Sequence, residues 1–252
     1  MAVLLAALAA TAQTTNSLTD AEIQGRNLAL QLCEGWPDSS TNTGVLQIRN
    51  AQGKRSIVPI KCEVIVGPAS WTSIYEAFFT NGTEVLRITH PIDQMESRVG
   101  DYPSGKFTGN VNDLDWIGTR STIEHTYAGQ EISNSSFAGS DFSVTDLSLG
   151  FFHWPQQVVL KKEVKRSRGC TVLESINPHP SPVSYSRVVT WIDNETLGIV
   201  QAQAYDAQGK LLKEFYPKDF KKVKGQWQVG MMDIENVQTG SRTRLIFDLK
   251  NG

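Results

Sequence analysis

The spacing of hydrophobic positions changes once along the chain, from about one helical turn to two residues. Near the start, Leu28 and Leu32 lie four residues apart and therefore share one face of a helix. Thr19 and Glu22 have the spacing of a capping box, and a glycine and a proline follow the segment. This pattern predicts one amphipathic helix over residues 20–34.

Beyond this helix, apolar and polar positions alternate with the period of β-strands, and turn residues separate the runs. The predicted strands are residues 45–48, 57–66, 71–79, 83–89, 158–164, 170–176, 186–192, 198–205, 210–216, 227–236 and 242–249. The connections within each group are short, which favours an antiparallel meander over parallel strands with crossover helices.

The turn sequences support hairpins. Residues 50–54 (NAQGK) and 206–210 (DAQGK) are near copies, which we interpret as the same hairpin chemistry used twice. Asn81-Gly82 is a strong signal for a further hairpin.

Residues 91–155 interrupt the alternation with glycines and prolines, and short helices are predicted at 113–117 and 140–147. In the second of these, we expect Ser140 or Asp141 to begin the helix and Asp146 to be solvated. Aromatic residues are dense in this region, which indicates packing rather than disorder: Trp116, Phe137, Phe142, Phe151, Phe152 and Trp154.

Many antiparallel strands with few helices must close, form a sandwich or wrap around something. We predict a strongly curved antiparallel sheet with the N-terminal helix and the short helices on its concave side. Such a sheet would hold an apolar hollow beneath a movable cover, which suits a lipid-like ligand. The alternative is that the same apolar residues fill an ordinary solid core.

Composition narrows the function classes. The 252 residues include 24 Lys and Arg against 26 Asp and Glu, a formal charge of −2. This balance excludes nucleic-acid binding driven by bulk charge. The 40% of hydrophobic residues excludes wholesale disorder, and no apolar run approaches the roughly 20 residues of a membrane-spanning helix.

The first twelve residues, MAVLLAALAATA, have the apolar stretch and small-x-small ending of a secretory signal peptide, without its positive start. We interpret residues 1–12 as the remnant of such a peptide and residues 13–252 as one domain. Cys33, Cys62 and Cys170 allow at most one intrachain disulfide, and all three also fit as small buried residues.

Little in the sequence indicates catalysis. Asp141 and Asp146 are close enough in the sequence to form an acid/base pair of carboxylates, but helix capping is the preferred interpretation. The four histidines are scattered, and no pair of cysteines has metal-ligand spacing. We predict a binding protein with no catalytic residues, no metal and no cofactor.

The basic residues gather in two places, residues 161–168 and 218–224. Solvated hairpins are the plain interpretation of such runs, and edge lysines also block strand pairing. The functional alternative is docking to an acidic partner or to anionic lipid head groups.

Residues 139–147 (GSDFSVTDL) resemble a stretch found in bacterial outer-membrane lipoprotein-sorting proteins, a family of the LolA-like superfamily of periplasmic carriers. Cys170 to Glu174, SRVVTWID (186–193), YDAQGKLLK (205–213) and Thr-Arg-Leu (243–245) are similar to later parts of the family pattern. The resemblance is strongest over about 137–249. It implies a mainly β, α+β fold: a half-open β-barrel whose open side is covered by the N-terminal helix and short lid helices.

The resemblance also implies a periplasmic carrier or receptor that holds acyl chains of lipoproteins or lipids, for sorting to the outer membrane. The alternative is a structural or sensory envelope protein of the same fold without a transported ligand. We expect a monomer with a transport partner in the inner or outer membrane and no nucleic-acid partner. Arg87, Arg98 and Arg120 are all candidates for the arginine that controls the lid in such carriers.

The residues predicted to line the cavity and its lid are apolar or aromatic and come from the helix, the strands and the short helices. They are Leu28, Leu32, Trp71, Tyr75, Leu86, Ile88, Phe142, Leu147, Phe151, Trp154, Val189 and Trp191. An error of one residue in the phase of a strand would exchange its inward and outward side chains.

Overall fold

The computed structural model describes residues 18–35, 37–68, 70–91, 121–128, 136–223 and 226–249. The predicted signal segment 1–12, the predicted short helix at 113–117, Arg98 and Arg120 lie outside these residues. The helices are α1 (Asp20–Glu34), α2 (Val144–Ser148) and the 3₁₀ helix η1 (Gly150–His153). The strands are β1 (Ser40–Arg49), β2 (Arg55–Val66), β3 (Ser70–Phe79), β4 (Gly82–Pro91), β5 (Ser121–Ala128), β6 (Gln156–Lys165), β7 (Arg168–Ile176), β8 (Arg187–Asp193), β9 (Ile199–Tyr205), β10 (Leu211–Val223), β11 (Gln226–Asn236) and β12 (Ser241–Phe247).

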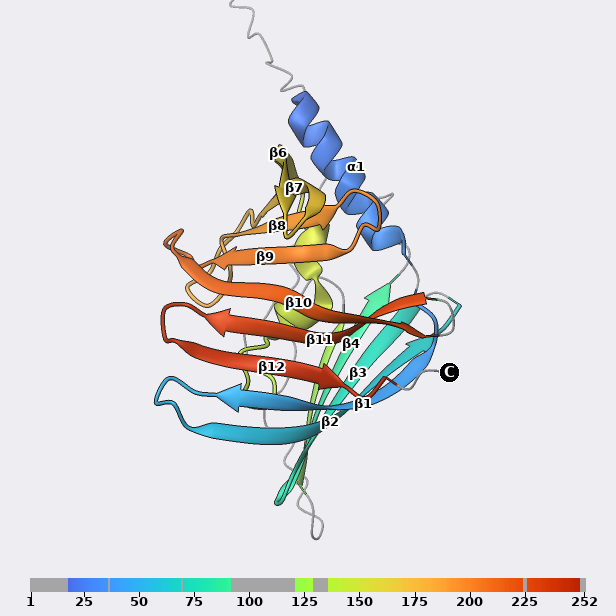
Figure 1. Cartoon of the computed structure of the whole chain (residues 1–252), viewed down its shortest axis with the longest axis vertical. Helices are drawn as coiled ribbons and strands as arrows, with labels where there is room; N and C mark the ends of the chain where they lie inside the picture. The colour runs from blue at the N-terminus through green and yellow to red at the C-terminus, as the bar shows by residue number, and fades with distance from the viewer. Residues whose placement is uncertain are drawn as a thin grey trace, which may run out of the picture.

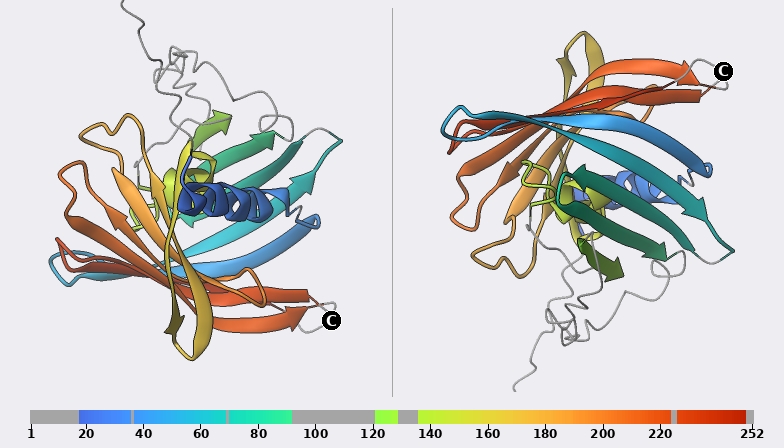
Figure 2. Two further views of the ribbon diagram at one scale, coloured as in Figure 1. Left: turned by 90° about the horizontal axis from the view of Figure 1, so that it is seen from above. Right: turned by 90° about the horizontal axis from the view of Figure 1, so that it is seen from below.

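All twelve strands form one sheet in the order β5-β4-β3-β2-β1-β12-β11-β10-β9-β8-β7-β6. The N-terminal and C-terminal groups meet where β1 pairs antiparallel with β12. The sheet bends strongly and its two ends stay apart, while α1, α2 and η1 lie within the bend (Figures 1 and 2). The predicted fold class, a mainly β, curved, half-open barrel covered by helices, is confirmed.

One described strand was not predicted. β5 pairs parallel with β4, in register from Gly82 with Ser121 to Thr89 with Ala128. It lies in the region that the sequence marks as irregular, so its alternation was masked by the breaks around it.

Strand alternation creates the inner face of the sheet. Across the pairings, the inward positions are occupied by residues such as Ile60, Leu86 and Leu46 in one group, and Ile234 and Leu245 in the other. These side chains pack against Phe137 and Phe142 of the connecting region. The core is therefore formed between the concave face of the sheet and the segments that cover it.

Helix α1 covers the edge strand β6. The predicted capping box is present, since Thr19 accepts a hydrogen bond from the Glu22 amide and Glu22 accepts one from the Thr19 amide. Gly25 lies so close to β6 that a Cβ there would collide with the backbone carbonyl oxygen of Gln157. The absence of a side chain at this position lets the helix lie directly on the strand.

The two NAQGK-like turns adopt the same geometry, as predicted. Asn50 Oδ1 accepts hydrogen bonds from the amides of residues 52 and 54, and Asp206 Oδ1 accepts from those of residues 208 and 210. Gly53 and Gly209 both have positive φ, at 80° and 76°. The side-chain oxygen and the glycine together fix each hairpin.

Candidate functional site

The segment from residue 136 to residue 154, here the cover segment, lies over the inner face of the sheet (Figure 1). Its helix α2 begins with a second capping box, in which Ser143 is the N-cap and Asp146 the third helical residue. The prediction that Ser140 or Asp141 begins this helix is corrected: Ser140 instead stabilises the preceding turn, where its hydroxyl donates to the carbonyl of Phe137.

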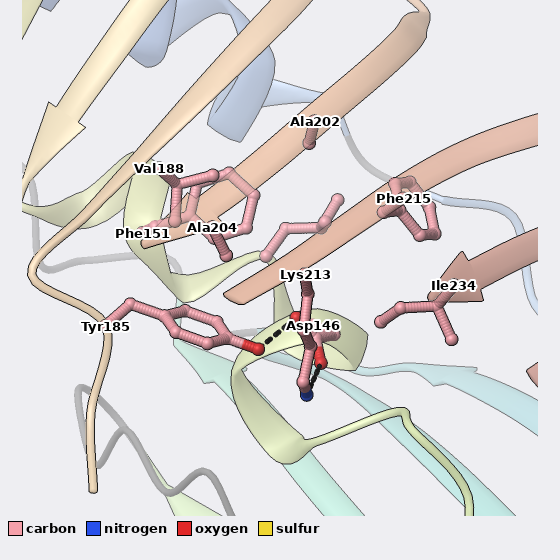
Figure 3. A pocket seen from close by; sticks show the side chains of 10 residues that line it. Asp146, Phe151, Tyr185, Val188, Ala202, Ala204, Lys213, Phe215 and Ile234 are labelled. Atoms are coloured by element: carbon pink, nitrogen blue, oxygen red, sulfur yellow. Dashed lines mark hydrogen bonds and ion pairs between the residues drawn. The ribbon is translucent and has the colours of Figure 1, made fainter. Parts of the chain in front are cut away.

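A buried group of polar residues fixes the cover segment to the sheet. Lys213 Nζ on β10 lies 3.0 Å from Asp146 Oδ2 and donates to the Asp141 carbonyl at 2.7 Å. Tyr185 donates its hydroxyl to Asp146 Oδ1 at 2.8 Å (Figure 3). We call Asp141, Asp146, Tyr185 and Lys213 the latch.

Burial sets the chemistry of the latch. The side chains of Lys213 and Asp146 are only 11% and 10% exposed, so the expectation of a solvated Asp146 is wrong. Burial, and then the Asp146 carboxylate, raises the pKa of Tyr185 well above its ordinary value. Tyr185 therefore remains a hydrogen-bond donor to Asp146 across the physiological pH range.

Asp141 completes the attachment on the other side. Its carboxylate accepts hydrogen bonds from Ser241 and Thr243 of β12, at 2.5 and 2.8 Å, and its amide donates to Thr243 Oγ1. Both carboxylates of GSDFSVTDL thus serve structural hydrogen bonds, in agreement with the preferred interpretation of the sequence. The motif joins α2 to both β10 and β12.

The space directly beneath the cover segment is small. The pocket between the latch and the inner face has a cavity volume of about 20 Å³, with Phe151, Val188 and Phe215 among its walls (Figure 3). This is room for about one water molecule. The apolar hollow expected beneath the short helices is therefore filled, because aromatic side chains of the cover segment occupy it.

A much larger open space lies at one end of the sheet. A trough of about 1320 Å³ is formed by the start of β1, the end of β2 and the adjacent ends of β10, β11 and β12. Its lining combines polar and charged residues, among them Asp38, Glu63 and Asp248, with the apolar residues Pro37, Val64, Ile65, Val223, Val229, Phe247 and Leu249. Val64 and Phe247 occupy inward register positions, and Phe247 packs against the core beneath the cover segment. The trough therefore opens onto the concave face.

Most of the predicted lining residues belong to the interior. Leu86, Ile88 and Phe142 are in the core cluster that also contains Ile234 and Leu245, with Tyr75 and Leu147 packed against it. Phe151 and Trp154 are in the second cluster, against which Leu28 and Leu32 of α1 pack. Trp71 is at an inward register position and stacks on His90 of β4, with ring centroids 3.6 Å apart.

Val189 and Trp191 lie elsewhere. They belong to a separate cluster with Cys170 and Val172, on the convex side of the sheet, and Val188 and Ile192 face the interior instead. The phase predicted for β8 is therefore wrong. The strand gave no clear signal because six of its seven residues are buried. On the outer side, Trp191 is covered by the β6–β7 hairpin, where Glu163 accepts its Nε1 hydrogen bond and Lys165 lies over its ring.

Sequence reasoning also missed Tyr185, Lys213 and the walls of the trough. A lysine at an inward position of β10, between Leu211 and Phe215, was the available signal for a buried charge. The trough had none, because its walls come from five strand ends. Of the candidate lid arginines, only Arg87 is described, and its register position opposite Ile74 places it on the outer side of β4. In the part of the chain that the structure describes, the cation Lys213 joins β10 to the cover segment, through the Asp141 carbonyl and the Asp146 carboxylate.

Burial raises the pKa of all three thiols above the ordinary value of a cysteine. All three cysteines are free, and burial, followed by the charge of Glu34, raises the pKa of Cys33 to about 12. Its sulfur lies 3.8 Å from His153 Nε2. A thiol with this pKa stays protonated at neutral pH and does not attack. Among the described residues, no group of three potential ligands is arranged to hold a metal ion, and no helix is long and apolar enough to span a bilayer.

Solved structures share this fold over most of the chain. A DUF1329 family protein from Desulfovibrio piger is 18% identical, with a TM-score of 0.61 over 91% of this chain and 92% of that one. A putative outer membrane lipoprotein-sorting protein domain from Vibrio parahaemolyticus is 19% identical, with a TM-score of 0.60 over 90% and 92%. A LolA superfamily protein from Nitrosomonas europaea is 14% identical, with a TM-score of 0.55 over 89% and 91%.

Comparison of sequences gives less information about this chain than comparison of structures. A family model described as an uncharacterized protein matches residues 126–249, and a search of curated proteins finds no significant match. At these identities the structural similarity shows the fold alone. The resemblance to lipoprotein-sorting proteins of the LolA-like superfamily, inferred from residues 137–249, is confirmed at that level.

Proposed function

We propose that this protein, which has the fold of LolA superfamily proteins, is a periplasmic carrier or receptor that binds acyl chains of lipoproteins or lipids. The observation that carries the proposal is the trough of about 1320 Å³ that opens onto the apolar concave face. Ligand pockets usually measure about 300–1,000 Å³, so this space suits a large, flexible ligand. The Vibrio parahaemolyticus domain, described as a putative lipoprotein-sorting protein, has the same fold.

Burial of methylene groups would supply the affinity. Each buried CH₂ contributes about 0.8 kcal/mol, so a chain of about 13 methylenes gains roughly 10 kcal/mol. Association itself costs about 4–15 kcal/mol. A single chain lying only in the trough therefore binds weakly, and tight binding needs further apolar surface from the concave face.

The cover segment would supply that surface by moving. In the closed arrangement only about 20 Å³ is free beneath it, so a chain enters there only when Phe142 or Phe151 is displaced. The latch opposes this displacement, and its loss or rearrangement would accompany loading. A carrier that must also release its cargo needs such a two-state element, and no covalent chemistry.

Retention of cargo is tested first. Native mass spectrometry of the purified full chain should detect a bound lipid or lipoprotein fragment, and a fluorescent acyl probe should bind and be displaced by long-chain fatty acid. A protein that retains no lipid and binds no probe contradicts the proposal. That result would favour the alternative of a structural or sensory envelope protein, which the filled pocket beneath the cover segment would fit.

Substitutions that introduce a negative charge test whether the acyl chain binds in the trough. Val64→Glu and Phe247→Glu each place a carboxylate at a half-buried, inward position, and we expect each to weaken probe binding at least about tenfold, since an unpaired charge opposes an acyl chain. Ile57→Glu is the matched control, because this side chain is 67% exposed and lies on the outer side of β2. Equal affinity in all three folded variants would contradict the assignment of the trough.

A further inference from the structure

We propose that the convex side of the sheet carries a docking surface for anionic phospholipid bilayers, where the β6–β7 hairpin meets β10. We call it the basic face. It consists of Lys165, Arg166, Lys218 and Lys222, with Phe220 as an exposed apolar residue; Lys162 and Val164 pair with Thr171 and Gly169 and therefore lie on the opposite face of β6. Docking through this surface does not depend on which cargo the trough holds.

Lys and Arg residues are concentrated in the two segments that form this surface. Residues 161–168 contain five cations and one carboxylate, and residues 218–224 contain four cations and one carboxylate, in a chain whose formal charge is −2. Some of these cations are already paired: Lys161 with Glu163, and Arg168 with Asp193 and Glu195. The four cations of the basic face form no ion pair with any described carboxylate, so their charge is available to a partner.

Contacts with aromatic rings bring the two basic segments together. The Arg166 guanidinium lies 4.4 Å from the centre of the Tyr216 ring, and its Nη1 donates to the Pro217 carbonyl at 3.4 Å. Lys218 lies 4.3 Å from the same ring, and Lys165 lies 4.5 Å from the centre of the Trp191 ring. The hairpin thus reaches over the convex side (Figure 2) and places cations from β6, its turn and β10 in one surface.

The turn of the β6–β7 hairpin keeps a cation where backbone geometry disfavours one. Arg166 and Ser167 both have positive φ, 49° and 63°, as in the hairpin turns that Asn-Gly normally occupies. For residues with a Cβ this region is sterically unfavourable. Arg166 thus places a cation at the tip of the hairpin although its backbone conformation is unfavourable for a residue with a Cβ.

An exposed apolar residue distinguishes a membrane from an acidic protein or a free polyanion. Phe220 is 47% exposed and alternates with Lys218 and Lys222 along the outer side of β10. Cations with interspersed apolar side chains suit the bilayer interface, where head groups bind the charge and the acyl boundary accepts the apolar groups. Charge alone would suffice for a polyanion.

The basic face also continues to the trough. Phe220 pairs in register with Val229, and Val223 follows Lys222 at the end of β10; both valines line the trough. A bilayer bound at the basic face would therefore lie beside the opening of the trough. This arrangement shortens the path of an acyl chain between membrane and carrier.

The test uses the full chain and vesicles of phosphatidylcholine with or without about 30% phosphatidylglycerol, in a flotation assay. We expect binding only to the anionic vesicles, with a loss of at least about tenfold when salt rises from about 0.05 to 0.5 M. Lys218→Glu combined with Lys222→Glu should abolish it. Lys54→Glu combined with Lys210→Glu changes the net charge equally at the two distant turns and should retain most of it. Equal binding by both double variants would overturn the proposal.

A second pair of variants separates a bilayer from other acidic partners. Val164→Ser, on the opposite face of β6, is the control. Phe220→Ser keeps every charge and should weaken vesicle binding several-fold while leaving binding to soluble poly-glutamate unchanged. If vesicle binding is also unchanged, or if the chain binds poly-glutamate but no vesicle, the basic face is not a bilayer surface. Acyl-probe affinity should be the same in all these variants, so failure of docking and failure of the carrier proposal are distinguishable.

Discussion

The ammonium group of Lys213 and the carboxylate of Asp146 form a buried ion pair, 3.0 Å apart, between the inner face of β10 and the first turn of α2. The two residues are 67 positions apart in the chain. The lysine also donates to the Asp141 carbonyl, so a single side chain connects the sheet to both ends of the GSDFSVTDL motif. One cation thus fixes the cover segment to β10 at two points.

Replacing this cation should release the cover segment. Lys213→Met keeps much of the side-chain volume but leaves Asp146 buried without its charge partner, which typically costs about 3–5 kcal/mol. We expect the free energy of unfolding to fall by that order and the amides of residues 137–153 to exchange faster in hydrogen-exchange mass spectrometry. Acyl-probe association should become faster as well, because opening limits entry.

Lys210→Met provides the control, since this lysine is exposed in the turn before β10. It should change neither exchange nor stability by more than about 0.5 kcal/mol. If Lys213→Met leaves the exchange of residues 137–153 at the wild-type rate, the latch does not hold the cover segment.

The contact of α1 with β6 makes a second prediction. Gly25→Ala places a methyl group against the backbone of Gln157 and Val158, neither of which can rotate away. The helix must shift, and we expect a loss of about 1–3 kcal/mol, despite the better helix propensity of alanine. Gly35→Ala at the end of the same helix meets nothing within 4 Å and should be near neutral. Urea denaturation of both variants measures the difference, and equal stabilities would contradict the close packing.

The sequence predicted local structure well because local physics determines it. The alternation around Leu46 and Ile60 set the strands, and Thr19 with Glu22 set the start of α1, each through residues close together in the chain. Two loops of the same composition formed the same turn. The only described strand it missed, β5, lies where breaks obscure the pattern.

The site depended on contacts between distant segments. Asp146 reads as a surface carboxylate until Lys213 and Tyr185 are placed beside it. Trp191 reads as an interior residue because β8 is buried on both sides, and only the crossing of the β6–β7 hairpin explains its outward position. The trough depends on the curvature of the whole sheet, which no single strand encodes.

The outward position of Trp191 yields a third prediction. Trp191→Ala removes a ring from the convex side. There the ring contacts Lys165 and belongs to the cluster of Cys170 and Val172, which contains no residue of the cover segment. We expect acyl-probe affinity within about twofold of wild type, a difference below about 0.5 kcal/mol. Phe247→Glu, in the trough, is the comparison and should be far weaker. A large loss of affinity in folded Trp191→Ala would place the acyl chain on the convex side.

His90 provides a prediction of pH dependence. Its ring stacks on Trp71, and burial, followed by the charge of nearby His153, lowers the pKa of His90 to about 4. The folded protein therefore holds His90 neutral, whereas the unfolded chain takes up a proton near the ordinary pKa of about 6.5. The stability that this difference provides is fully present above pH 6.5 and is lost as the pH falls from 6.5 to 4.

His90→Phe keeps an aromatic ring against Trp71 and removes the proton. Between pH 7 and pH 5 the free energy of unfolding should fall more for wild type than for this variant, because other titrating groups are common to both and cancel in the comparison. Urea denaturation at the two pH values measures the effect, with His179→Phe as the control at an exposed loop position. Wild type and His90→Phe that lose stability in parallel would show that His90 takes up its proton equally in the folded and unfolded states, and would contradict its burial against Trp71.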